Sequence, residues 1–129
     1  MSVTIKIIVP GEPIVKPRMS RRDSFIVRPC VGRYREYQNR IYKAIVENRL
    51  HLRKPRVPVA LSIDFFVSSP RGMDLSNLVK SAEEGLHPVL LDDDTIDHIK
   101  RYDRCEARRC IPRDARTEIT IVEIDGCSR

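Results

Sequence analysis

The sequence lacks any long hydrophobic run. No apolar stretch approaches the ~18 residues that a membrane-spanning helix needs, and no signal peptide opens the chain. We therefore expect a cytoplasmic protein with no membrane partner. Hydrophobic residues make up 41% of the chain and charged residues 33%, a composition typical of a folded protein. The absence of internal repeats and the length of 129 residues favour a single domain over residues 1–129.

The sequence also lacks closely paired cysteines. Its four cysteines form no CxxC pair, so no zinc signature is complete: Cys30, Cys105, Cys110 and Cys127. Two interpretations stay open. Cys105 and Cys110 with His98 are one candidate ligand set, whereas reduced, partly buried thiols are usual in a cytosolic protein. We favour the thiols, and we expect no small-molecule cofactor.

Acidic residues are scarce in the first part of the chain. Residues 1–57 hold 14 Lys/Arg and 4 Asp/Glu, a net charge of +10, whereas residues 58–129 hold 10 and 14, a net of −4. A solvated basic surface is the simplest explanation of such a charge run. The density of cations here favours a nucleic-acid-binding segment instead.

The hydrophobic patterns predict an α+β domain in which two helices pack on a mixed sheet. Alternating apolar residues predict strands, apolar residues at helical spacing predict helices, and three prolines exclude a helix over residues 10–23. Tyr34 and Tyr37 fall on the apolar side of the first helix, which favours core packing over base stacking. The expected strands are 3–9, 24–29, 59–67, 95–104 and 116–124, and the expected helices are 34–50 and 74–86.

Carboxylates gather in two places that the predicted elements bring to loop ends. Asp74 precedes the second helix, and Asp92, Asp93 and Asp94 precede the next strand. Sites are commonly built on such loops. Oxygen ligands from two converging segments suit Mg²⁺, which keeps several waters for a substrate phosphate. We therefore predict a magnesium site that acts on a phosphodiester.

Lys80 stands among these acids, where a cation binds a scissile phosphate or stabilises the charge of the transition state. Each of these residues also has a purely structural explanation. Asp74 is placed to cap the helix, Lys80 is placed to pair with Glu83 or Glu84, and the three aspartates fit a solvated turn. Their combination in a basic protein favours a functional site.

The segment DLSNLVKSAEEGL…LLDDDTI resembles the signature of the RusA family of Holliday-junction endonucleases. The family pattern runs Asp-x-Asp-Asn-Leu-x-Lys, then Asp-Ala-Leu, then a hydrophobic stretch into Asp-Asp-x-x-Ile. The chain matches it at Asp74, Asn77, Leu78, Lys80, Leu86, Asp92, Asp93 and Ile96. The segment VPGEPIVKPRMSRR resembles the family's opening, with Gly-x-Pro-x-x-Lys-x-Arg at Gly11, Pro13, Lys16 and Arg18.

The resemblance implies a RusA-like fold and a homodimer that cuts a branched DNA, the four-way junction, by paired nicks with Mg²⁺ or Mn²⁺. It implies catalytic roles for Asp74, Lys80 and Asp93. It implies that Asp74 and Asp93 bind the metal, with Asp92 beside them. When the Asp-Asp-x-x-Ile pattern is aligned on Ile96, its second aspartate falls on Asp93 rather than Asp94. The DNA contacts that we expect are Lys16, Arg18, Arg21, Arg22, Arg71 and Asn77.

Ser76 stands where the family has its second aspartate, and a neutral hydroxyl is a poor Mg²⁺ ligand. Three explanations stay open. Glu83 supplies the missing charge, since it lies within about 20° of Ser76 around the helix, although about 10 Å along it. Alternatively, the site works with the remaining aspartates and an extra water. In the third, the protein binds junctions and does not cut them.

Three hypotheses for the function follow. The first is a Mg²⁺-dependent endodeoxyribonuclease that resolves four-way junctions in DNA recombination and repair. The second is a non-catalytic protein that binds branched DNA on the same fold, which Ser76 motivates. The third is an unrelated small α+β protein whose acids hold a structural cation.

Overall fold

The computed structural model describes residues 4–17, 29–87, 89–91 and 97–124. Within these ranges the chain forms four strands, two α-helices and two short 3-10 helices. In chain order these are β1 (Thr4–Pro10), α1 (Pro29–Glu47), η2 (Leu50–Arg53), β2 (Val59–Val67), α2 (Leu75–Leu86), β3 (Ile99–Arg109), η3 (Pro112–Asp114) and β4 (Arg116–Glu123). The predicted α+β class, with two helices and a mixed sheet, is confirmed.

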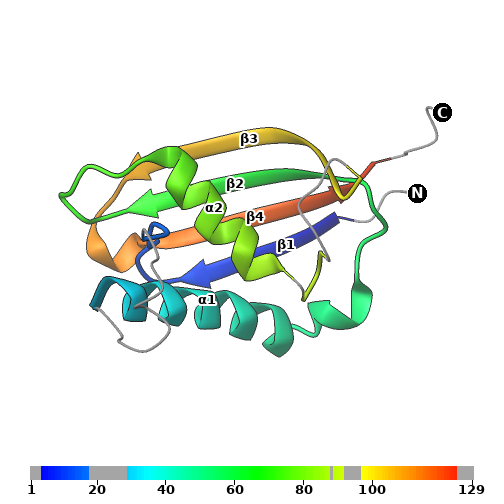
Figure 1. Cartoon of the computed structure of the whole chain (residues 1–129), viewed down its shortest axis with the longest axis horizontal. Helices are drawn as coiled ribbons and strands as arrows, with labels where there is room; N and C mark the ends of the chain where they lie inside the picture. The colour runs from blue at the N-terminus through cyan, green and yellow to red at the C-terminus, as the bar shows by residue number, and fades with distance from the viewer. Residues whose placement is uncertain (1–3, 18–28, 88, 92–96, 125–129) are drawn as a thin grey trace.

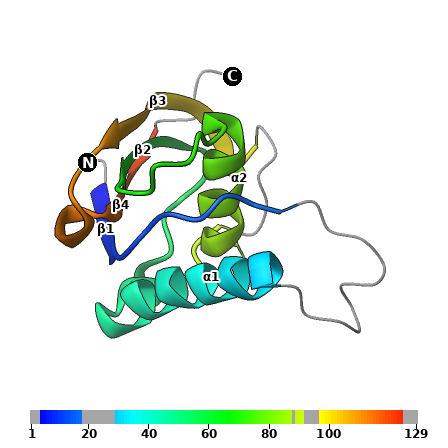
Figure 2. The same ribbon diagram turned by 90° about the vertical axis from the view of Figure 1, so that its left-hand side faces the viewer.

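The four described strands form one sheet in the order β1-β4-β2-β3. Strand β4 runs antiparallel to both of its neighbours, whereas β2 and β3 are parallel. Parallel neighbours need a crossover connection, and α2 lies in the connection between β2 and β3. Both helices lie on the same face of the sheet, as Figures 1 and 2 show.

The core lies between this covered face and the helices. Burial alternates along β1, β2 and β4, as it does when only one face of a sheet is covered. Tyr37 and Ile41 of α1 and Leu78 of α2 are fully or almost fully buried against the strands. Gly85 of α2 lies so close to Ile41 that an added Cβ would overlap the isoleucine side chain. The two helices therefore pack tightly at this point.

The first helix differs from its prediction at both ends. It was expected over residues 34–50, but α1 begins at Pro29 and ends at Glu47. Proline suits a first helical turn, since the helix does not use its missing N–H there. The helix ends before Arg49 because that residue has a left-handed φ of 56°. Of the strand expected over residues 24–29, residues 24–28 lie outside the described residues and Pro29 belongs to α1.

The third described strand also differs from its prediction. It was expected over residues 95–104, but β3 spans Ile99–Arg109, with Asp97 and His98 in a turn. Its second half is charged and exposed, so the sequence carries no burial pattern there. Pairing with β2 as far as Val67 extends the strand despite this composition.

The described residues contain no helix that combines the length and the apolar character needed to cross a membrane.

Candidate functional site

Helix α2 begins after Asp74, which is its N-cap. The backbone N–H groups of Asn77 and Leu78 both donate to the Asp74 carbonyl oxygen over 3.1 Å. Its φ of −82° and ψ of 121° are the extended values that an N-cap adopts. The Asp74 side chain makes no capping hydrogen bond, and the residue is exposed. Asp74 therefore occupies the predicted N-cap position, but its carboxylate does not cap the helix.

The outer surface of α2 carries a row formed by Ser76, Lys80 and Glu83. At 100° per residue these three lie within about 60° of one another around the helix. Glu83 lies toward β3, because its charge contributes to the raised pKa of the Cys105 thiol, after burial as the main cause. The opposite side of α2 faces the core through Leu78, Ser81, Ala82, Gly85 and Leu86.

Lys80 is exposed and makes no ion pair with any residue in the described part of the chain. Its i+4 neighbour Glu84 is instead bound by Lys16 and by Tyr34. The structural explanation in which Lys80 pairs with Glu83 or Glu84 is therefore not realised among the described residues. The lysine side chain leans back toward the start of the helix, as helical side chains do.

Glu84 joins three segments of the chain. Lys16 donates to its Oε2 over 2.5 Å, and the Tyr34 hydroxyl donates to its Oε1 over 2.5 Å. Burial alone would raise the pKa of Glu84, but the hydrogen bonds from Lys16 and Tyr34 outweigh it and lower the pKa. Burial and the same carboxylate raise the pKa of Tyr34. Lys16, expected at the DNA, is therefore already engaged by a carboxylate.

The loop of residues 11–17 crosses α2, as Figure 2 shows. Gly11 begins it with a φ of 99°, which favours glycine, and donates its N–H to the Ala115 carbonyl over 3.0 Å. Arg40 of α1 donates to the carbonyl oxygens of Pro10 and Glu12 over 2.7 Å each. Pro13 is buried. The Gly-x-Pro segment therefore has a structural role, which is to fix this loop on the helices.

The loop of residues 68–74, between β2 and α2, is held from two sides. The Glu12 carboxylate accepts hydrogen bonds from the backbone N–H of Ser68 and of Ser69 over 3.2 Å, and from the Ser68 hydroxyl over 2.5 Å. Arg109 at the end of β3 donates to the carbonyl oxygens of Ser69 and Arg71. Because this loop leads into Asp74, Glu12 and Arg109 set the start of α2. The Arg71 side chain is exposed.

The described acids do not converge on one point. Asp74 and Glu83 are nine residues apart on a helical path, which separates their Cα atoms by about 13 Å along the axis. Oxygen ligands lie within about 2.1 Å of Mg²⁺, so these two carboxylates do not share an ion in this helix. No group of three His, Cys, Asp or Glu in the described ranges could hold a metal. Asp92 and Asp93 lie outside the described residues, as do Arg18, Arg21 and Arg22.

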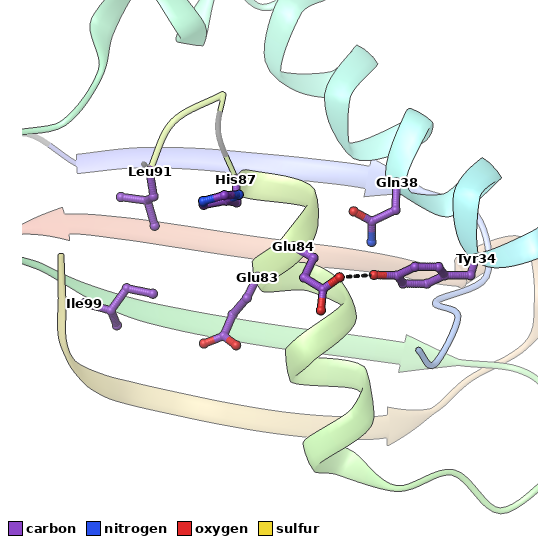
Figure 3. Close-up of a pocket in the computed structure, with 7 residues that line it drawn as sticks. All are labelled: Tyr34, Gln38, Glu83, Glu84, His87, Leu91 and Ile99. Atoms are coloured by element: carbon purple, nitrogen blue, oxygen red, sulfur yellow. Dashed lines mark hydrogen bonds between the residues drawn. The ribbon is translucent and has the colours of Figure 1, made fainter. Parts of the chain in front are cut away.

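A hollow of about 500 Å³ lies over the C-terminal half of α2 (Figure 3). Glu84 points toward α1 and its tyrosine, whereas Glu83 points to the opposite side of the helix. The lining contains two carboxylates, of which Glu84 is already paired with Lys16. The lining residues are Tyr34, Gln38, Glu83, Glu84, His87, Leu91 and Ile99.

The described cysteines are free thiols. Cys30, Cys105 and Cys110 are partly buried, and desolvation is the main cause that raises the pKa of Cys105 and of Cys110. Free, partly buried thiols at these three positions match the favoured interpretation. Cys105, Cys110 and His98 form no group that could hold a metal within the described residues, and Cys127 lies outside them.

The sequence analysis did not foresee the contacts by which four residues organise this region: Glu12, Tyr34, Arg40 and Arg109. Tyr34 was expected in the core, and its burial is confirmed, but its hydroxyl bond to Glu84 was not foreseen. The partners of these residues lie 28 or more positions away in the chain. Local spacing carries no signal for such contacts.

The sequence matches no protein-family model, and no curated protein matches it at a significant level.

Proposed function

We propose that the protein is a metal-dependent endonuclease that cuts branched DNA, with the four-way junction as its substrate. One observation carries the proposal: Asp74 and Lys80 are exposed, and neither side chain is used by the fold within the described residues. Asp74 lies at the start of α2 and Lys80 lies along its outer surface. A carboxylate that can hold a metal and an ammonium that can bind a phosphate suit phosphodiester hydrolysis. The resemblance to the RusA family points to the same residues.

Each residue has a defined role in this proposal. Asp74 holds a Mg²⁺ ion together with Asp92 and Asp93, and Mn²⁺ substitutes for it. The ion, when bound, polarises the phosphodiester and lowers the pKa of a bound water. Lys80 binds a phosphate oxygen as a point charge. Glu83 is not a partner of Asp74 at the same ion, because of the helical separation given above.

Basic side chains near the loop of residues 68–74 hold the DNA backbone. Arg71 is exposed, and Asn77 is half-buried with its carbonyl accepting the Lys16 N–H over 3.5 Å. Arg18, Arg21 and Arg22 follow the loop of residues 11–17 in the sequence and are the further DNA contacts of this proposal. Lys16 contributes a DNA contact only if a phosphate replaces Glu84 as the partner of its ammonium group, or binds that ammonium group together with Glu84.

A homodimer is part of the proposal because a four-way junction presents two equivalent strands. A two-fold dimer has two active sites related by the same symmetry. Paired nicks then arise within one complex. We also place the protein in the cytoplasm.

A second candidate is a non-catalytic protein that binds branched DNA. Ser76 favours it, because the residue is exposed at the start of α2 and offers no charge to a metal. In this alternative the cations retain their role and the acids do not.

The test is nicking of a labelled four-way junction in Mg²⁺ and in EDTA, with linear duplex as the control substrate. We expect cuts in the junction alone, lost in EDTA and in Asp74→Asn and Asp93→Asn, with junction binding retained. Asp103→Asn is the matched control, because Asp103 pairs with Arg101 on β3 and should leave cutting unchanged. Tight binding without cuts at any Mg²⁺ or Mn²⁺ concentration would support the second candidate, and Ser76→Asp would then be expected to create activity. An absence of DNA binding at low salt would contradict both.

A further inference from the structure

Cations gather at the end of α1 and in the turn that follows it. Residues 43–57 contain five Lys or Arg and a single acid, Glu47. The cations are Lys43, Arg49, Arg53, Lys54 and Arg56, and all five are exposed. We call them the α1–η2 surface. None of them belongs to the candidate site around α2.

Several cations elsewhere in the described chain are paired with acids. On the sheet, five of them form ion pairs with carboxylates: Lys6, Arg101, Arg104, Arg108 and Arg116. In contrast, the side chains of Lys43, Arg49, Arg53 and Arg56 form no ion pair with a residue of the described ranges. The Arg56 backbone N–H donates to the Glu123 carboxylate over 2.7 Å. The charges of Lys43, Arg49, Arg53 and Arg56 are therefore not balanced by an ion pair within the described residues.

Large apolar side chains are exposed in the same segment. Leu52 is 70% exposed, Tyr42 is 51% exposed and Val57 is 45% exposed. Hydrogen bonds from Arg49 N–H to the Val46 carbonyl and from Leu52 N–H to the Arg49 carbonyl fix the turn. Exposed apolar groups beside unpaired cations, on a fixed backbone, are typical of a binding surface rather than a merely solvated one.

We propose that the α1–η2 surface binds the sugar-phosphate backbone of a duplex arm of the DNA substrate. Unpaired cations attract a polyanion, and the arginines among them match phosphate geometry with two parallel N–H groups. Tyr42 and Leu52 then contact the deoxyribose. This inference rests on the proposed function, since it adds a second contact to the same substrate.

The surface lies far from the loop that carries Asp74. Figure 1 draws η2 and the loop of residues 68–74 at opposite ends of the longest axis, with α1 running along it. The 19 residues of α1 span about 27 Å, which corresponds to about 8 bp of duplex. A junction arm shorter than this cannot reach the surface while the branch point is at α2.

The test compares two variants with the same change of charge. Lys43→Gln/Arg53→Gln/Arg56→Gln removes three unpaired cations, and Lys6→Gln/Arg101→Gln/Arg108→Gln removes three paired ones. Binding is measured in EDTA as a function of salt, on junctions with arms of about 20 bp and of about 6 bp. Urea unfolding of each variant establishes that it is folded.

On long arms we expect the slope of the logarithm of the binding constant against the logarithm of salt concentration to be smaller in magnitude by about 2 to 3 in the first variant. The slope of the control variant should change much less. On short arms the first variant should match wild type. Equal losses in both variants would show that only net charge matters and would overturn the proposal. A first variant that binds long arms as tightly as wild type would also overturn the proposal. This holds equally if that variant binds DNA normally but no longer binds vesicles of anionic lipid. These measurements do not depend on cutting. If wild type binds the junction but does not nick it, the proposed nuclease is refuted, whereas the test of arm binding by the α1–η2 surface still stands.

Discussion

At the scale of single residues, Gly85 explains how closely the two helices pack. A Cβ at this position would overlap Ile41 Cδ1 and lie 3.0 Å from its Cγ2. We predict that Gly85→Ala lowers the free energy of unfolding by about 1 to 3 kcal/mol, because strain exceeds the gain in helix propensity. Urea denaturation measures the change.

Two further variants test this explanation of Gly85. Gly72→Ala is the matched control, since a Cβ there meets nothing within 4 Å, and it should be neutral. Ile41→Val removes the nearest atom, so it should offset part of the cost when combined with Gly85→Ala. Equal effects of the two glycine substitutions would contradict the packing argument.

Glu84 gives stability a dependence on pH. Its pKa is lower in the folded chain than the ordinary value of 4.5, so the stabilisation is complete above pH 4.5 and is lost as pH falls through the lower folded value. At neutral pH the free energy of unfolding of wild type should exceed that of Glu84→Gln by about 1 kcal/mol or less, because Lys16 and Glu84 are both partly exposed. The difference should shrink as the solution becomes more acid.

The measurement for Glu84 is urea unfolding at a series of pH values for wild type and Glu84→Gln. Glu106→Gln controls for the loss of one carboxylate, because Glu106 pairs with Arg104 and Arg108 at the exposed surface of β3. A gap between wild type and Glu84→Gln that stays constant down to pH 2 would show that the pKa of Glu84 is not lowered.

At the scale of elements, the loop of residues 68–74 is positioned by Glu12 and Arg109. Replacing Glu12 by Ala leaves the N–H groups of Ser68 and Ser69 without their acceptor, which shifts the start of α2. If the proposed nuclease is correct, kcat on the junction should fall about tenfold or more while KM changes little, because displacement of a reacting group costs rate. Single-turnover nicking measures this.

Glu12→Gln is the conservative companion, since the amide oxygen still accepts one of these hydrogen bonds and should retain more activity than Ala. Hydrogen exchange of residues 68–73 adds a readout that does not need cutting, and exchange should accelerate in Glu12→Ala alone. If exchange and kcat both match wild type, Glu12 does not position this loop.

The sequence pattern predicted elements best where one face is buried. Strands β2 and β4 and helix α2 lie within one residue of their predicted bounds, because apolar spacing follows burial directly. The length of β3 could not be predicted, since its charged second half depends on pairing with β2. The early start of α1 at Pro29 was missed because residues 24–29 were predicted to form a strand and the helix was predicted to begin at Tyr34.

The candidate site was predictable only in its local part. Asp74 as the N-cap of α2 follows from its position before an apolar periodic run. The contact between Lys16 and Glu84, which are 68 positions apart, could not be predicted, because local spacing carries no information on such contacts. Within the described residues, the structure contains neither a capping side chain at Asp74 nor an i+4 ion pair at Lys80, although both fitted the local sequence.

At the scale of the whole molecule, charge is distributed unevenly. The sheet carries alternating cations and carboxylates that neutralise one another. The end of α1 and the turn after it carry five exposed cations and one acid, Glu47. On α2, Asp74 and Lys80 are exposed and form no ion pair within the described residues. If both proposals are correct, the first surface binds a duplex arm and the second takes part in cutting.

The proposed homodimer gives the last prediction, which concerns two active sites in one complex. Wild type mixed in equal amounts with Asp74→Asn and allowed to exchange should leave about a quarter of the dimers with two intact sites and half with one. On a supercoiled plasmid with an extruded cruciform, paired cuts give linear product and a single cut gives a nicked circle. The linear product should therefore fall to about a quarter while nicked circles appear. Mixing with Asp103→Asn instead should leave the linear product unchanged, and a fall to half without nicked circles would show that subunits do not share a junction as an exchanging dimer.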